Sequence, residues 1–150
     1  MDQDTEKAIE RLQDNLYVIR RMAGWTAEDL GEKIGVTKQT IRNLERRNNN
    51  AKMSKTQYIA IRAVLDYEVE NNPDNQALAK VIEVLLDSEE MPEEDYEQVR
   101  EAVTFASNSV AGGTSNESVV AMLGKLLVDT PIISVGLIQS GVWLARMLKK

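Results

Sequence analysis

Apolar residues recur at three- and four-residue spacing along nearly the whole 150-residue chain, while regular alternation of apolar and polar residues is almost absent. Three- and four-residue spacing places side chains on one face of a helix, whereas alternation is typical of a strand. The pattern therefore predicts an all-α fold. The helices expected in the first half span residues 5–23, 27–34, 38–46 and 54–70, and the buried stripe of the first contains Ile9, Leu12, Leu16, Ile19 and Met22.

The second and third of these helices are short, and the residues around them specify where each begins and ends. Thr26 and Thr37 precede them as N-caps, and Asp29 completes a capping box with Thr26. Gly35 supplies the turn between them, and Gly31 is a small residue where they approach each other. Together with their inward apolar positions, this pattern predicts a helix-turn-helix. Those positions are Leu30, Ile34, Val36, Ile41 and Leu44.

The helical pattern is interrupted at "ENNPDN", where Pro73 and the asparagines favour a break. We therefore expect an N-terminal helix-turn-helix domain of residues 1–72 and an acidic C-terminal helical domain of residues 73–150. Proline and glycine signals divide the second domain into further segments with helical periodicity. These segments are 76–90, 92–110, 117–129 and 131–150.

The last segment, "PIISVGLIQSGVWLARMLKK", is apolar around most of its circumference. Its length is compatible with a membrane span, but Gln139, Ser140 and Arg146 interrupt the apolar surface and favour burial against protein. Together with "VVAMLGKLL" it carries more apolar surface than a small helical unit readily hides. We therefore expect no membrane insertion, and a homodimer formed through the C-terminal half.

Composition narrows the chemistry that the chain can perform. The absence of Cys and His removes the usual zinc ligands, thiol nucleophiles and Ser-His relays, so we expect no metal, no cofactor and no enzyme activity. The acidic run 87–101 could form a metal site or mimic nucleic acid, but carboxylates after Pro92 are also favoured simply as the start of a helix. The polar, acidic start "MDQDTEKAIERLQD" lacks the pattern of a secretory signal, which indicates a cytoplasmic protein.

Charge is distributed unevenly along the chain. The formal net charge is −6, yet residues 33–62 hold eight basic groups against one acid, Glu45, or about +7. Residues 67–150 hold six basic and fourteen acidic groups, or about −8. The basic groups are Lys33, Lys38, Arg42, Arg46, Arg47, Lys52, Lys55 and Arg62. The two halves therefore face different partners, and the basic stretch favours nucleic acid.

The outward face of the third expected helix carries Lys38, Gln39, Arg42 and Asn43. Amide side chains can pair with adenine in the major groove, and cationic side chains can pair with guanine. A short amphipathic helix that packs on an ordinary core normally carries Glu and Lys on its outward face instead. The face therefore predicts contacts with base edges of double-stranded DNA.

The segment "LYVIRRMAGWTAEDLGEKIGVTKQTIRNLERR", followed by "YIAIRAVL", resembles the phage-repressor type of helix-turn-helix domain, the Cro/C1 or XRE-like family. The resemblance covers about residues 16–65 and implies a lambda-repressor-like bundle of about five helices, with the helix at 38–46 in the major groove. It also implies that Lys38, Gln39 and Asn43 contact bases, with Arg42 able to reach base or phosphate.

The resemblance assigns further roles around this helix. It pairs Arg20 with Glu45 as a structural ion pair. Arg47 stands where Gly often ends the recognition helix in this family, which favours a longer helix or an end at Asn48. Phosphate contacts are expected from Thr26, Thr40, Arg46, Arg47, Asn48, Lys52 and Ser54.

These observations predict a sequence-specific DNA-binding regulator of transcription, acting as a repressor. Two alternatives stay open. The first is an antitoxin that regulates its own gene while its C-terminal half binds a partner protein. The second is a protein-interaction module built on the same fold.

Overall fold

The computed structural model describes residues 3–46, 51–87, 93–111 and 142–148. Every regular element in these ranges is an α-helix, which confirms the all-α prediction for this part of the chain. The helix expected at 117–129 lies outside the described residues. The helices are α1 (Gln3–Met22), α2 (Ala27–Ile34), α3 (Lys38–Glu45), α4 (Lys55–Asn71), α5 (Gln76–Leu86), α6 (Glu93–Ala111) and α8 (Val142–Leu148).

The starts of α2, α3 and α4 are set by side chains that cap them. The Thr26 hydroxyl accepts a hydrogen bond from the Asp29 N–H (3.0 Å), and the Asp29 carboxylate accepts one from the Thr26 N–H (2.9 Å). At α3 the Thr37 hydroxyl accepts from the Thr40 N–H (3.1 Å). Ser54 caps α4 in the same way, with Gln57 completing a capping box. The predicted starts of α2 and α3 are therefore confirmed, and Ser54 precedes α4 as its N-cap instead of being its first residue.

The turn between α2 and α3 depends on two glycines. Gly35 has a φ of +81°, in the left-handed region, and its N–H donates to the Gly31 carbonyl (2.8 Å). A Cβ added to Gly31 would lie 2.6 Å from the Val36 carbonyl oxygen. Both residues therefore act as the sequence predicted: one allows the turn, and the other allows the close approach.

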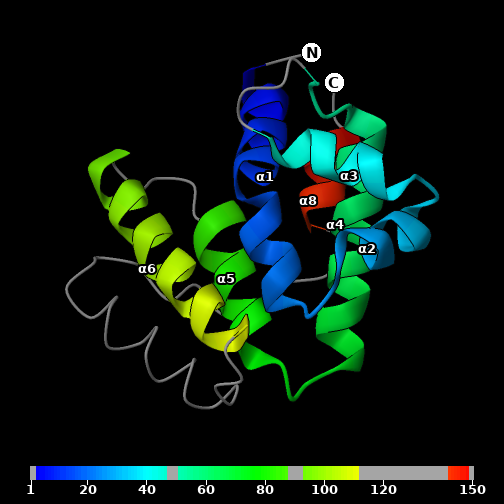
Figure 1. Cartoon of the computed structure of the whole chain (residues 1–150). Helices are drawn as coiled ribbons and strands as arrows, with labels where there is room; N and C mark the ends of the chain where they lie inside the picture. The colour runs from blue at the N-terminus through cyan, green and yellow to red at the C-terminus, as the bar shows by residue number, and fades with distance from the viewer. Residues whose placement is uncertain (1–2, 47–50, 88–92, 112–141, 149–150) are drawn as a thin grey trace.

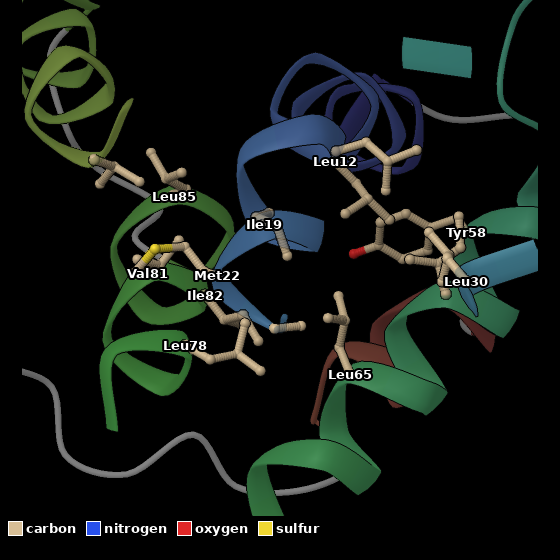
Figure 2. Packing of buried hydrophobic residues seen from close by; sticks show 14 of the residues in the cluster. Leu12, Ile19, Met22, Leu30, Tyr58, Leu65, Leu78, Val81, Ile82 and Leu85 are labelled. Carbon is tan, nitrogen blue, oxygen red and sulfur yellow. The ribbon is translucent and has the colours of Figure 1, made fainter. Parts of the chain in front are cut away.

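α1 runs through the middle of the molecule, with α5 and α6 on one side and α2, α3 and α4 on the other (Figure 1). All five residues of its predicted apolar stripe are buried. Leu30, Ile41 and Leu44 are also buried, whereas Ile34 and Val36 are half-buried against the same core. In Figure 2, Leu12 lies beside the ring of Tyr58, on the helix-turn-helix side of α1. The amphipathic pattern thus places α3 with one face in the core and one face in solvent.

α5 and α6 are packed directly on α1. Leu78, Val81 and Ile82 of α5 are directed toward Ile19 and Met22 of α1 (Figure 2), and all five belong to one buried hydrophobic cluster. Two side-chain bonds add to this packing, from Asn75 Nδ2 to the Met22 carbonyl (2.9 Å) and from Asn15 Nδ2 to the Tyr96 hydroxyl (2.6 Å). The division of the chain at residues 72–73 stays a prediction, and α5 and α6 share their core with the preceding helices.

α8, the described part of the last apolar segment, packs against α4. Its Trp143 ring meets Tyr58 edge to face, with centroids 5.9 Å apart, and its indole N–H donates to Asp66. Trp143 and Met147 are buried. No helix within the described ranges is both long and apolar enough to cross a membrane.

Candidate nucleic-acid interface

The outward face of α3 presents a ridge of polar side chains to solvent. Lys38, Gln39 and Arg42 are exposed and Asn43 is half-buried. Ile41 and Leu44 hold the opposite face in the core. We call Lys38, Gln39, Arg42 and Asn43 the polar ridge. Its four side chains point outward because the apolar positions of the same helix are fixed inside.

Two amides of the polar ridge are already bonded to each other. Gln39 Nε2 donates to Asn43 Oδ1 over 2.9 Å, one helical turn along α3. Among the residues that the structure describes, no further hydrogen bond involves the side-chain oxygen or second N–H of Gln39, or the amino group of Asn43. Adenine offers one donor and one acceptor in the major groove, which this set of groups can match.

The starts of α2 and α4 differ in charge, although each could present N–H groups to a phosphate. α2 begins with Glu28 and Asp29. The hydrogen bond from the Thr26 backbone, and then that from its side chain, lower the pKa of Asp29, so this carboxylate is charged beside Thr26. α4 has no acid in its first turn and is capped by the neutral Ser54 and Gln57. The start of α4 is therefore electrostatically more favourable for a phosphate than the start of α2.

The segment after α3 carries the remaining cations expected to meet phosphates. Arg46 and Lys52 are exposed. Arg47 and Asn48 lie outside the described residues. α3 ends at Glu45, and its C-cap Arg46 is extended, with φ −80° and ψ 119°. The expected longer helix or end at Asn48 is therefore wrong, because the chain leaves the helix at Arg46 without a left-handed residue there.

Gln13 of α1 connects this segment to the core, a role that was not predicted from the sequence. Its Nε2 donates to the carbonyls of Leu44 (3.1 Å) and Ala51 (2.8 Å), and its Oε1 accepts from the Met53 N–H (2.9 Å). One signal in the sequence pointed to it. Gln13 lies four residues after Ile9 and three before Leu16, so it shares the inward face of α1, where a polar side chain requires partners.

Arg20 and Glu45 join α1 to the end of α3 through a bidentate ion pair. Arg20 Nε lies 2.7 Å from Glu45 Oε2, and the second terminal nitrogen lies 2.9 Å from Oε1. Arg20 also donates to the Trp25 carbonyl (2.9 Å). The two side chains are only 11% and 8% exposed. The geometry leaves Glu45 engaged with Arg20, so the one acid of the basic stretch is turned away from the polar ridge.

Two cations of the basic stretch lie against aromatic rings. Arg62 is fully buried, forms two hydrogen bonds with Asp87 (3.1 and 3.2 Å) and lies 5.1 Å from the centroid of the Trp143 ring. The prediction that the charge of Arg62 belongs to a basic surface for nucleic acid is therefore wrong. Lys33 lies over the ring of Trp25 at 5.0 Å, and this half-buried ring packs against the core.

The acidic positions do not gather into a metal site in the part of the chain that the structure describes. No group of three or more His, Cys, Asp or Glu side chains there could hold an ion. The chemistry available at the surface of α3 is hydrogen bonding and charge pairing, which suits recognition.

Comparison with known families finds one matching model, described as a helix-turn-helix, over residues 16–70. No curated protein and no solved structure matches the chain. The matched segment begins in the middle of α1, contains α2 and α3, and ends near the end of α4. Residues 16–70 are thus similar to helix-turn-helix domains of the XRE/Cro/C1 type, and this similarity supports a DNA-binding regulator.

Proposed function

We propose that the protein is a sequence-specific regulator of transcription, and a repressor, that reads the major groove of double-stranded DNA with α3. The observation that carries the proposal is the polar ridge, which faces solvent while Ile41 and Leu44 of the same helix are held in the core. A helix presented in this way can enter the major groove, where its side chains reach base edges.

Base contacts are assigned to the four side chains of the polar ridge. Phosphate contacts are assigned to residues flanking the ridge at helix starts and in the segment after α3, because such contacts fix the register of the protein on the duplex. The phosphate-contacting residues are Thr26, Thr40, Arg46, Arg47, Asn48, Lys52 and Ser54. Among the capping residues, Ser54 is the strongest candidate, since the carboxylate of Asp29 lies beside Thr26.

A homodimer completes the proposal. One small helix-turn-helix domain buries limited area on DNA, and two joined domains on half-sites about one helical turn apart gain apparent affinity through effective concentration. The C-terminal half, with its surplus of apolar side chains, is the proposed source of the dimer contact. A cytoplasmic location is proposed because the proposed partner is DNA.

The test is selection of bound sequences from a random duplex pool with the full chain, together with its mass in solution. We expect one enriched palindromic site and the mass of a dimer. Asn43→Ala should then cost about 1–3 kcal/mol at one base position. The matched control is Asn71→Ala, because Asn71 is an exposed asparagine at the end of α4.

Two outcomes would contradict the proposal. Wild-type protein that binds no duplex even in dilute buffer would exclude DNA recognition. Triple replacement of Lys38, Gln39 and Asn43 by Ala with no change in DNA affinity would exclude α3 as the reading element and favour a protein-interaction module.

A further inference from the structure

Gln13 is the side chain through which α1 holds both ends of the segment between α3 and α4. All three of its bonds reach main-chain atoms 31 to 40 positions away in the sequence: the carbonyls of Leu44 and Ala51 and the N–H of Met53. Both Nε2 hydrogens are thereby used, together with the amide oxygen. A half-buried glutamine so fully bonded fixes the chain that it touches.

We propose that Gln13 is a positioning residue for DNA binding, which holds Arg46 and Lys52 where they can meet phosphates of the duplex. The inference deepens the proposed function and rests on it. Gln13 itself does not contact DNA in this proposal, and it acts on affinity through these two cations.

The placement of the two cations supports this role. Lys52 lies between Ala51 and Met53, and the main chain of both neighbours is bonded to Gln13. Arg46 follows Leu44 by two positions, and the Leu44 carbonyl is the third bonded group. Arg46, Lys52 and Gln13 also line one open hollow of about 880 Å³ beside α1.

The way in which α3 ends explains why such a residue is needed. α2 ends with Gly35 in the left-handed conformation, so its own backbone N–H closes the last turn. α3 ends with Arg46 extended, and the Leu44 carbonyl accepts from the side chain of Gln13. Past Lys52, the buried side chain of Met53 anchors the chain before α4 begins. Gln13 therefore sets the path of the chain at the points where Arg46 and Lys52 project.

A cation on a loose segment must be ordered when it binds a phosphate, and this ordering weakens binding. Phosphate contacts carry no sequence information, so the loss should be the same for every duplex. We therefore expect Gln13→Met to weaken DNA binding about tenfold and to flatten its salt dependence.

The experiment compares Gln13→Met with wild type in the full chain, using a mixed-sequence DNA duplex at several salt concentrations. The same change is then made in a background that carries Arg46→Ala and Lys52→Ala, where it should alter affinity by less than about twofold, since coupled residues are non-additive. The matched control is Gln98→Met, because Gln98 is an exposed glutamine of α6. Helical content measured for each variant ensures that folded proteins are compared.

A second measurement does not depend on DNA. Hydrogen exchange of the Met53 amide should accelerate in Gln13→Met and stay close to wild type in Gln13→Glu, which keeps an acceptor for that N–H. If Gln13→Met does not fold, Gln13→Ala takes its place in the DNA comparison, because it removes all three bonds to the main chain without adding a charge.

Each result has a distinct meaning. A wild-type protein that binds no duplex overturns the proposed function. If wild type binds, two results overturn the positioning role of Gln13 while the proposed function stands. In the first, Gln13→Met binds as tightly as wild type. In the second, Gln13→Met lowers the affinity as much in the background with Arg46→Ala and Lys52→Ala as it does alone. Unchanged exchange of the Met53 amide in Gln13→Met also overturns the positioning role.

Discussion

The ion pair between Arg20 and Glu45 offers the sharpest test of how α3 is held against α1. Arg20→Met removes two bonds to the Glu45 carboxylate, of 2.7 and 2.9 Å, and a third to the Trp25 carbonyl. Methionine keeps most of the length of the arginine stem, so packing is largely preserved. The remaining Glu45 side chain is only 8% exposed and would lose its partner with little access to water.

The expected cost follows from this burial. Breaking a well-buried pair by removing one partner costs about 3–5 kcal/mol of unfolding free energy, and the residual exposure here places the expectation at about 3 kcal/mol. Glu45→Met should cost a similar amount of unfolding free energy. Of the three Arg20 hydrogen bonds described above, only the one to the Trp25 carbonyl then remains. The double variant should lose about 1–3 kcal/mol less than the sum of the two single variants, since neither charge is then left behind.

Urea unfolding followed by circular dichroism measures all three variants against wild type. Glu10→Met is the control, because Glu10 is an exposed glutamate of α1 and its replacement should change stability by less than about 0.5 kcal/mol. Single-variant losses below about 1 kcal/mol, or strictly additive losses, would show that the pair behaves like a surface salt bridge and would refute the reasoning. A changed base preference in Glu45→Met would instead make Glu45 a reader of DNA.

Three further predictions address the turn, the surface and the capping box. Gly31→Ala should lower the unfolding free energy by about 1–3 kcal/mol, because its Cβ would lie 2.6 Å from a backbone oxygen. Glu32→Ala, at the exposed neighbouring position, should not lower it. Equal urea midpoints for the two variants would contradict this prediction. Arg46→Ala should weaken binding to all DNA duplexes alike and reduce the slope of log affinity against log salt concentration by about one. Asn43→Ala should instead weaken binding through one base pair. Identical sequence preferences for both variants would exclude Arg46 as a phosphate contact and Asn43 as a base contact. Asp29→Ala should destabilise the protein near neutral pH, and its deficit relative to wild type should shrink below pH 3.8. The hydrogen bonds from Thr26 lower the pKa of Asp29 in the folded protein, so its stabilising contribution is present above the unfolded pKa and is lost as pH falls through the folded value. Urea titrations at two pH values would test this, and a deficit independent of pH would count against it.

Local features of the sequence were sufficient to locate the helices around the turn. Thr26 and Thr37 cap helices that begin one residue later, and the bonds involved span only three positions. Gly35 and Gly31 act within the same turn. Such features are readable from the sequence because each depends on neighbours that the chain keeps close in every compact conformation.

Helical spacing also identified which side chains enter the core, with exceptions that are informative. The apolar stripe of α1 is buried as predicted, but the same inward face includes Gln13, whose partners could not be identified from periodicity. Arg62 appeared to be one more cation of a basic surface. Its burial depends on Asp87, 25 positions away, and on Trp143 of α8.

The sequence by itself determined an all-α chain, the helix-turn-helix within it and the polar face of α3, because these follow from periodicity and from contacts within a few residues. Only the tertiary structure decided that α5 and α6 cover α1, that Gln13 secures the segment after α3, and that Arg62 is removed from the surface. Each of these depends on residues that are distant in the sequence. They either form hydrogen bonds with a buried polar side chain or cover an apolar helix face. That choice is made among many possible partners when the whole chain packs, and no local pattern encodes it.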